Sequence, residues 1–342
     1  MINIKLWSFS GEEGVKLDKK PRVLVTRRIP QEGLNILEES CQVEVSDYDG
    51  VMPREILLQK VKGVDGILCL LNDDIDWEVM EAAGQNLRVI SNYAVGYDNI
   101  DIEEATKRKI MVTNTPGVLT EATADLAWAL LMAVARRVVE GDRFVREGKF
   151  RGWEPLLLLG DDVYGATLGI IGLGRIGQAM ARRARGFDMR IIYFDYHQVK
   201  DIEKELGVTY HPFPELLAQS DFVSLHVPLT RETYHLIGEK ELKMMKKESY
   251  LINTSRGPVI DEKALVRALR EGWIRGAALD VFEQEPQIEP ELLGLDEVVL
   301  TPHLGSASHA TRTKMAVLAA RNLVLALQGE TPPHLVNPDV VK

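Results

Sequence analysis

Cysteine is scarce in this chain of 342 residues, which contains only Cys41 and Cys69. Two thiols this far apart form neither a disulfide framework nor a C-x-x-C redox pair. They are most simply buried and reduced, which favours a cytoplasmic protein.

The sequence also lacks the patterns that mark several other classes of protein. It has no apolar run near 18 residues, and its N-terminus, with Glu12 and Glu13, has no signal-peptide core, so we expect no membrane contact. A net charge of −10 argues against binding to nucleic acid or anionic lipid. The seven histidines show no metal-binding spacing, and no G-x-S-x-G elbow is present, so we expect neither a metal site nor a serine hydrolase.

What the chain does contain is an alternation of strand and helix patterns. Its length suggests two domains, because single cores stop growing near about 250–300 residues. After an extension over residues 1–20, the first unit alternates at a pitch typical of a parallel sheet covered on both faces. Its strands are predicted over 22–26, 42–45, 66–70 and 87–91, and its helices over 31–38, 53–60 and 76–83.

Two segments follow that are unusually apolar. Residues 119–139 predict one long helix with Thr120 as N-cap, apolar on nearly all sides and therefore buried between the two units. Residues 148–165 contain Trp153 and four consecutive leucines, too apolar for a solvated loop of that length. We expect this arm to pack against a partner subunit; packing within its own chain is the alternative.

The second unit opens with a glycine-rich turn between a strand and a helix. Gly172, Gly174 and Gly177 follow the apolar run 167–171 and fit G-x-G-x-x-G. The glycines allow a tight turn, a close approach of pyrophosphate and close helix packing, and the helix N-terminus attracts the phosphate. Further strands are predicted over 190–194, 222–225, 250–253, 276–279 and 298–300, with helices over 262–271 and 310–327.

Asp195 strengthens the interpretation of this turn as a dinucleotide site. It ends the next strand, about 20 residues on, where an acidic side chain accepts hydrogen bonds from the adenosine ribose. A purely structural turn and a methyltransferase cofactor site are the alternatives.

Three polar features come directly after later strands of this unit. Ligands of such sheets bind beyond the carboxyl ends of the strands. Arg256 offers a two-pronged donor to a carboxylate, His303 can hold and release a proton, and Glu285 belongs to an acidic cluster that could orient it. Any one of them could be an ordinary surface residue, but together they favour a catalytic site.

These motifs resemble the D-2-hydroxyacid dehydrogenase family from about Pro21 to the C-terminus. The resemblance rests on the glycine turn, Ser255-Arg256-Gly257, residues 279–286, and Thr301-Pro302-His303 with Gly305. Residues 92–101, 112–116 and 159–165 are most similar to those of glyoxylate/hydroxypyruvate reductases.

The resemblance implies a role for each site residue. Arg256 would bind the carboxylate and carbonyl of a small 2-oxo acid, His303 would donate the proton, and Glu285 would orient His303. Val95 and Gly96, with Leu71 nearby, would hold the carboxylate. Because Asp195 would repel the extra phosphate of NADPH, we expect NADH as the cofactor. The other cofactor-binding residues would be Thr123, Leu173, Arg175, Ile176, Pro228, Thr233, Thr254, Ser255 and Asp280, with the three turn glycines and Gly305.

The family resemblance also implies an α/β fold of two doubly wound parallel-sheet domains. A Rossmann-type cofactor domain, residues 116–306, would be inserted into a split flavodoxin-like substrate domain, residues 21–115 plus 307–342. Members are typically dimers joined through the cofactor domains. Three alternatives stay open: oxidation of 3-phosphoglycerate, oxidation of phosphite, and a nucleotide-sensing corepressor that binds proteins.

Overall fold

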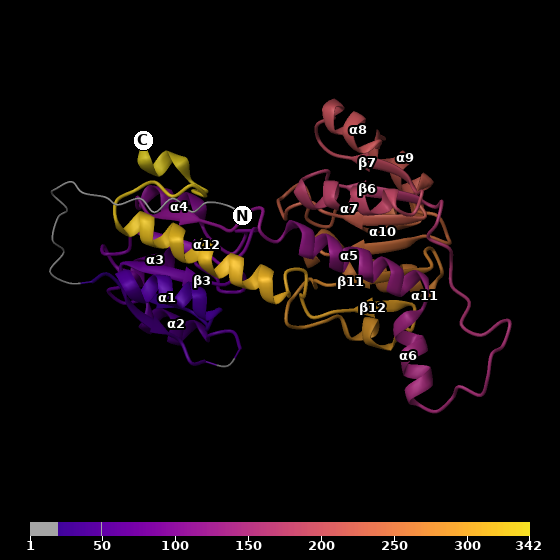
Figure 1. Cartoon of the computed structure of the whole chain (residues 1–342), viewed down its shortest axis with the longest axis horizontal. Helices are drawn as coiled ribbons and strands as arrows, with labels where there is room; N and C mark the ends of the chain where they lie inside the picture. The colour runs from indigo at the N-terminus through magenta and orange to yellow at the C-terminus, as the bar shows by residue number, and fades with distance from the viewer. Residues whose placement is uncertain (1–19, 49) are drawn as a thin grey trace, which may run out of the picture.

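A computed structural model describes residues 20–48 and 50–342. It contains two α/β units, at left and right in Figure 1. The predicted extension, residues 1–20, lies outside the described residues except for Lys20. Within the described ranges, no helix is both long and apolar enough to cross a membrane.

The first unit is built on a parallel five-stranded sheet. Its strand order is β2 (Gln42–Val45), β1 (Arg22–Val25), β3 (Gly66–Cys69), β4 (Val89–Asn92) and β5 (Met111–Thr113). This 2-1-3-4-5 order is the flavodoxin-like one. The helices between the strands are α1 (Gln31–Ser40), α2 (Arg54–Lys60), α3 (Trp77–Ala83) and α4 (Ile102–Lys107).

The end of the chain completes this first unit. Helix α12 (His309–Leu327) packs against α1 and against β3, β4 and β5. The contact between α1 and α12 is close, because a Cβ on Gly33 would lie 2.7 Å from the Cβ of Ala316. Beyond α12, the N–H of Val112 donates to the side chain of Asn337 (2.9 Å).

The second unit is built on a parallel seven-stranded sheet. Its order is β12 (Val298–Leu300), β11 (Gly276–Leu279), β10 (Tyr250–Asn253), β9 (Phe222–Leu225), β6 (Thr167–Ile171), β7 (Arg190–Phe194) and β8 (Thr209–Tyr210). Counted from β6, this is the Rossmann order 3-2-1-4-5-6 with one strand added. Its helices are α7 (Arg175–Arg185), α8 (Lys200–Leu206), α9 (Phe213–Gln219), α10 (Glu239–Met244) and α11 (Glu262–Arg270). The predicted fold class, a Rossmann-type unit inserted into a flavodoxin-like one, is confirmed.

The long helix expected over 119–139 is in fact two helices. Helix α5 (Thr120–Ala135) ends at Arg136, and α6 (Val138–Arg146) begins after Arg137, whose left-handed φ of 51° breaks the helix. Thr120 is the first helical residue rather than the N-cap, which is Leu119. Helix α5 packs against α7, β10, β11 and β12, so it covers the seven-stranded sheet instead of bridging the units.

The arm formed by residues 148–165 projects from the second unit, at lower right in Figure 1. Trp153 is 84% exposed and Leu156 is 79% exposed. The returning end is anchored to the sheet and to α5: the N–H of Asp161 donates to the carbonyl of Ala135 (2.9 Å), and its carboxylate accepts from Tyr250. Most of the apolar surface of the arm therefore finds no cover within its own described chain.

Candidate active site

A cavity of about 510 Å³ lies between the two units and is lined by residues from both. It lies beyond the carboxyl ends of the strands, where ligands of such sheets bind. Fourteen of the predicted site residues line it: Leu71, Val95, Gly96, Thr123, Gly174, Arg175, Ile176, Pro228, Thr254, Ser255, Arg256, Asp280, His303 and Gly305.

The glycine turn has the geometry that a dinucleotide site needs. Gly172 has a φ of 93°, and a Cβ on Gly177 would lie 2.1 Å from the carbonyl oxygen of Gly172. Gly174 has open space beside it, which leaves room for a phosphate. Asp195 adjoins the turn and accepts hydrogen bonds from the N–H groups of Leu173 and Tyr196, both at 2.8 Å. This turn therefore fits a dinucleotide.

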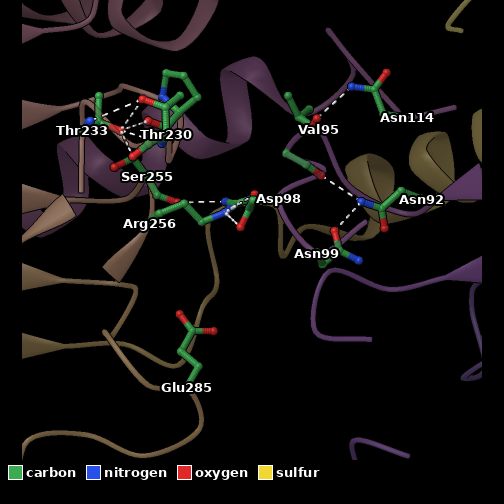
Figure 2. Close-up of polar contacts among 12 residues, drawn as sticks. Asn92, Val95, Asp98, Asn99, Asn114, Thr230, Thr233, Ser255, Arg256 and Glu285 are labelled. Atoms are coloured by element: carbon green, nitrogen blue, oxygen red, sulfur yellow. Dashed lines mark hydrogen bonds and ion pairs between the residues drawn. The ribbon is translucent and has the colours of Figure 1, made fainter. Parts of the chain in front are cut away.

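The loop after β9, which contributes to the cavity, differs in detail from the expectation. Thr233 is only 2% exposed, and its hydroxyl donates to the carbonyl of Pro228 (2.6 Å), so it shapes the turn from behind (Figure 2). Thr230 and His226, which sequence reasoning did not select, line the cavity instead. Their position just after β9 was the available signal. Burial lowers the pKa of His226 to about 4, which keeps its ring neutral.

His303 and Glu285 form a direct pair at the cavity. The Nδ1 atom of His303 lies 2.9 Å from Oε2 of Glu285, and each side chain is 24% exposed. Burial opposes ionisation of Glu285, but the hydrogen bond and charge of His303 outweigh it and hold the pKa of that carboxyl below its ordinary value. His303 has a φ of 55°, a left-handed conformation that is costly away from glycine and that often accompanies functional sites.

The other acids near His303 have different partners. Asp280 accepts hydrogen bonds from the hydroxyl of Thr301 and from the N–H groups of Leu304 and Gly305, so it anchors the loop that carries His303. Burial raises the pKa of Asp280. Glu283 pairs with His235 (2.9 Å) instead. Glu285 is therefore the acid that faces His303.

Arg256 reaches across the cavity to the first unit. Its Nε donates to Oδ1 of Asp98 (3.0 Å), and its Nη1 donates to the carbonyl of Ser255 (2.9 Å), as Figure 2 shows. A Cβ on Gly96 would lie 1.8 Å from Nη2 of Arg256, so the guanidinium needs a glycine there. Sequence reasoning missed Asp98, although it lies within the 92–101 motif.

The comparisons with known proteins agree with this geometry. Residues 128–305 match the model of the D-isomer specific 2-hydroxyacid dehydrogenase NAD-binding domain. The chain belongs to the D-isomer specific 2-hydroxyacid dehydrogenase family. It is 60% identical to a glyoxylate reductase of Korarchaeum cryptofilum, over 94% of this chain and 98% of the relative. A glyoxylate reductase of Pyrococcus horikoshii is 59% identical over the same shares.

Solved structures of family members share the whole architecture. One is an NADPH-dependent glyoxylate/hydroxypyruvate reductase from Sinorhizobium meliloti, solved with NADP and malonate. It is 34% identical, with a TM-score of 0.82, over 94% of this chain and 98% of that one. A Thermus thermophilus protein is 47% identical, with a TM-score of 0.86, over 92% and 99%. Membership of this family makes the chain an NAD(P)-dependent dehydrogenase of small 2-oxo and 2-hydroxy acids.

Proposed function

We propose that this protein reduces glyoxylate and hydroxypyruvate to the corresponding 2-hydroxy acids, D-glycerate in the case of hydroxypyruvate. The observation that carries the proposal is that Arg256 and His303, the latter paired with Glu285, line one cavity beside a dinucleotide turn. The identity of 53–60% to relatives named glyoxylate reductase supports this choice of substrate.

Each side chain then has a distinct task. A nicotinamide cofactor in the cleft supplies the hydride. Arg256 binds the substrate carboxylate and polarises its carbonyl through charge-assisted hydrogen bonds. Nδ1 of His303 is held by Glu285, which leaves Nε2 to deliver a proton to the carbonyl oxygen. The backbone at Val95 and Gly96, with Leu71 nearby, lines the part of the cavity where the carboxylate would be held.

We further propose that NADH is preferred over NADPH. Asp195 places a negative charge beside the turn, where the 2′-phosphate of NADPH would lie, and its carboxylate is held there by two N–H groups. Steady-state assays with each cofactor test this preference. A catalytic efficiency with NADPH equal to or above that with NADH would contradict it.

The substrate proposal is tested directly by following the loss of NADH absorbance after a 2-oxo acid is added. The four acids to compare are glyoxylate, hydroxypyruvate, 3-phosphohydroxypyruvate and pyruvate. We expect the first two to have the highest kcat/KM. No turnover with any of the four would favour the corepressor alternative, while activity confined to the phosphorylated acid would favour the 3-phosphoglycerate alternative. Oxidation of phosphite with NAD⁺ tests the remaining alternative.

The domain division and the assembly extend the proposal. Residues 21–115 with 307–342 would form the substrate domain, and residues 116–306 the cofactor domain. We propose a homodimer joined through the cofactor domains, because the arm and α6 carry large exposed apolar side chains. A monomer by light scattering at assay concentration would refute the dimer. The exposed side chains are Val138, Val139, Val145, Phe150, Trp153, Leu156 and Leu159.

We also propose a cytoplasmic location. Cys41 and Cys69 are both free and buried. Free thiols are typical of proteins in reducing compartments such as the cytoplasm. Fractionation of cells of the source organism tests this.

A further inference from the structure

Two loops of the five-stranded unit line the cavity beside Arg256. The loop after β3 contributes Leu71, and the loop after β4 contributes Gly96 and Tyr97; all three residues line the cavity. No acceptor among residues 20–48 and 50–342 takes a hydrogen bond from these three N–H groups. Converging N–H groups form an anion-binding concavity.

The direction of each N–H group is set by the carbonyl that precedes it. In a trans peptide the C=O of one residue and the N–H of the next point in opposite directions within one plane. A side chain that holds the carbonyl on one side of a loop therefore aims the following N–H to the other side.

Three asparagine side chains hold the carbonyls of Leu70, Val95 and Gly96, each by donating a hydrogen bond; Figure 2 shows the bonds to Val95 and Gly96. Nδ2 of Asn114 donates to the carbonyl of Val95 (2.7 Å), and Nδ2 of Asn92 donates to the carbonyl of Gly96 (2.8 Å). Nδ2 of Asn99 donates to the carbonyls of Leu70 (3.1 Å) and Asp73 (3.0 Å).

The asparagines also fix one another. Nδ2 of Asn92 donates to Oδ1 of Asn99 (2.9 Å), which leaves the amide of Asn99 only one orientation, with both of its hydrogens toward the first loop. Asn92 is fully buried, and Asn99 is half-buried. The network thereby joins the two loops across the sheet edge.

We propose that Asn92, Asn99 and Asn114 are positioning residues for substrate recognition. They aim the N–H groups of Leu71, Gly96 and Tyr97 at the substrate carboxylate. The proposal rests on the proposed function, since it assigns the carboxylate to this concavity. Asp98 lies in the same loop and contacts Arg256, so the network also sets where the guanidinium meets the substrate.

Asn99→Ala and Asn114→Ala test the proposal in the full-length enzyme. Carboxylate contacts exist in both ground and transition states, so their loss raises KM more than it lowers kcat. We expect each variant to raise KM for glyoxylate about tenfold and to weaken inhibition by oxamate by the same factor. The expected change in kcat is below about threefold, with the Kd for NADH, from fluorescence titration, unchanged.

Two further variants separate positioning from general destabilisation. Asn99→Asp keeps the size of the side chain and the acceptor for Asn92 but removes both donations, so it should reproduce the Asn99→Ala effect on KM and oxamate. Asn35→Ala is the matched control and should leave KM unchanged, because Asn35 is an exposed residue of α1 whose side-chain oxygen accepts a hydrogen bond from Gln31.

The outcomes distinguish a failure of the positioning role from a failure of the proposed reductase function. A wild-type enzyme without activity on any 2-oxo acid would overturn the proposed function. An active wild type whose Asn99 and Asn114 variants keep KM and oxamate inhibition within twofold would overturn the positioning role alone. A lower Tm with an unchanged KM would mean that these asparagines only stabilise the fold. A loss of NADH affinity as large as the rise in KM would also overturn the positioning role.

Discussion

Glu285→Gln removes the charge opposite His303 while nearly keeping the shape of the side chain. In the wild type, Oε2 of Glu285 faces Nδ1 of His303 at 2.9 Å and Oε1 accepts from the N–H of Phe282 at 3.1 Å. A carboxylate serves both donors, but an amide has one oxygen and so leaves one donor facing its NH₂ group. The substitution therefore removes the negative charge that faces His303 and weakens the hydrogen bond that orients its ring.

The size of the effect follows from the hydrogen bond to a charged group. Such a bond contributes about 1.5–3 kcal/mol, and the substitution leaves His303 with a weaker partner. Because about 1.4 kcal/mol corresponds to a factor of ten in rate, kcat/KM should fall about 10- to 100-fold in both the reduction and the oxidation direction.

Steady-state kcat/KM in both directions, measured at one pH, gives the size of this loss. Glu283→Gln is the matched control, because Glu283 forms the same kind of pair with His235, also at 2.9 Å. A kcat/KM that stays within twofold of the wild type in Glu285→Gln, or that falls equally in Glu283→Gln, would refute the assignment.

Three further predictions concern the same cavity. Arg256→Lys loses the two-pronged donor, so kcat/KM for glyoxylate should fall about 10- to 100-fold while fluorescence titration shows normal NADH binding. Gly96→Ala should abolish most activity, because its Cβ would lie 1.8 Å from Nη2 of Arg256, whereas Gly294→Ala, with open space, should retain it in the same assay. Because the pKa of Glu285 is lower in the folded protein than its ordinary value of 4.5, its carboxylate stabilises the fold at pH values above 4.5. This stabilisation is lost as the pH falls through the lower pKa of the folded state, so the difference in unfolding free energy between wild type and Glu285→Gln should shrink in acid.

The sequence predicted those parts of the fold that local patterns encode. Glycines at fixed spacing after an apolar strand have few structural solutions, so residues 167–177 identified the Rossmann turn. Arg256 and His303 follow strands β10 and β12, and parallel strands bring their carboxyl ends to one edge. That rule predicts that both residues lie at the same edge of the sheet.

Features that depend on tertiary contacts escaped prediction. The break at Arg137 is made by a single residue in the left-handed conformation, and nothing in the local pattern marks it. Strand β5 has three residues and α4 has six, too short for a periodic signal. The partnership of Asp98 with Arg256 joins residues 158 positions apart, so only the folded chain reveals it.

The return of α12 to the first unit has a consequence for how the chain is made. Synthesis proceeds from the N-terminus, so strands β1 to β5 leave the ribosome long before the helix that covers them. The seven-stranded unit is formed by one continuous stretch of sequence and can fold as it emerges. Gly33 and the apolar face of α1, by contrast, stay uncovered until Ala316 and its neighbours in α12 have been synthesised. A chain released before residue 309 would carry a finished nucleotide-binding half joined to an uncovered sheet, which makes this gene intolerant of late stop codons.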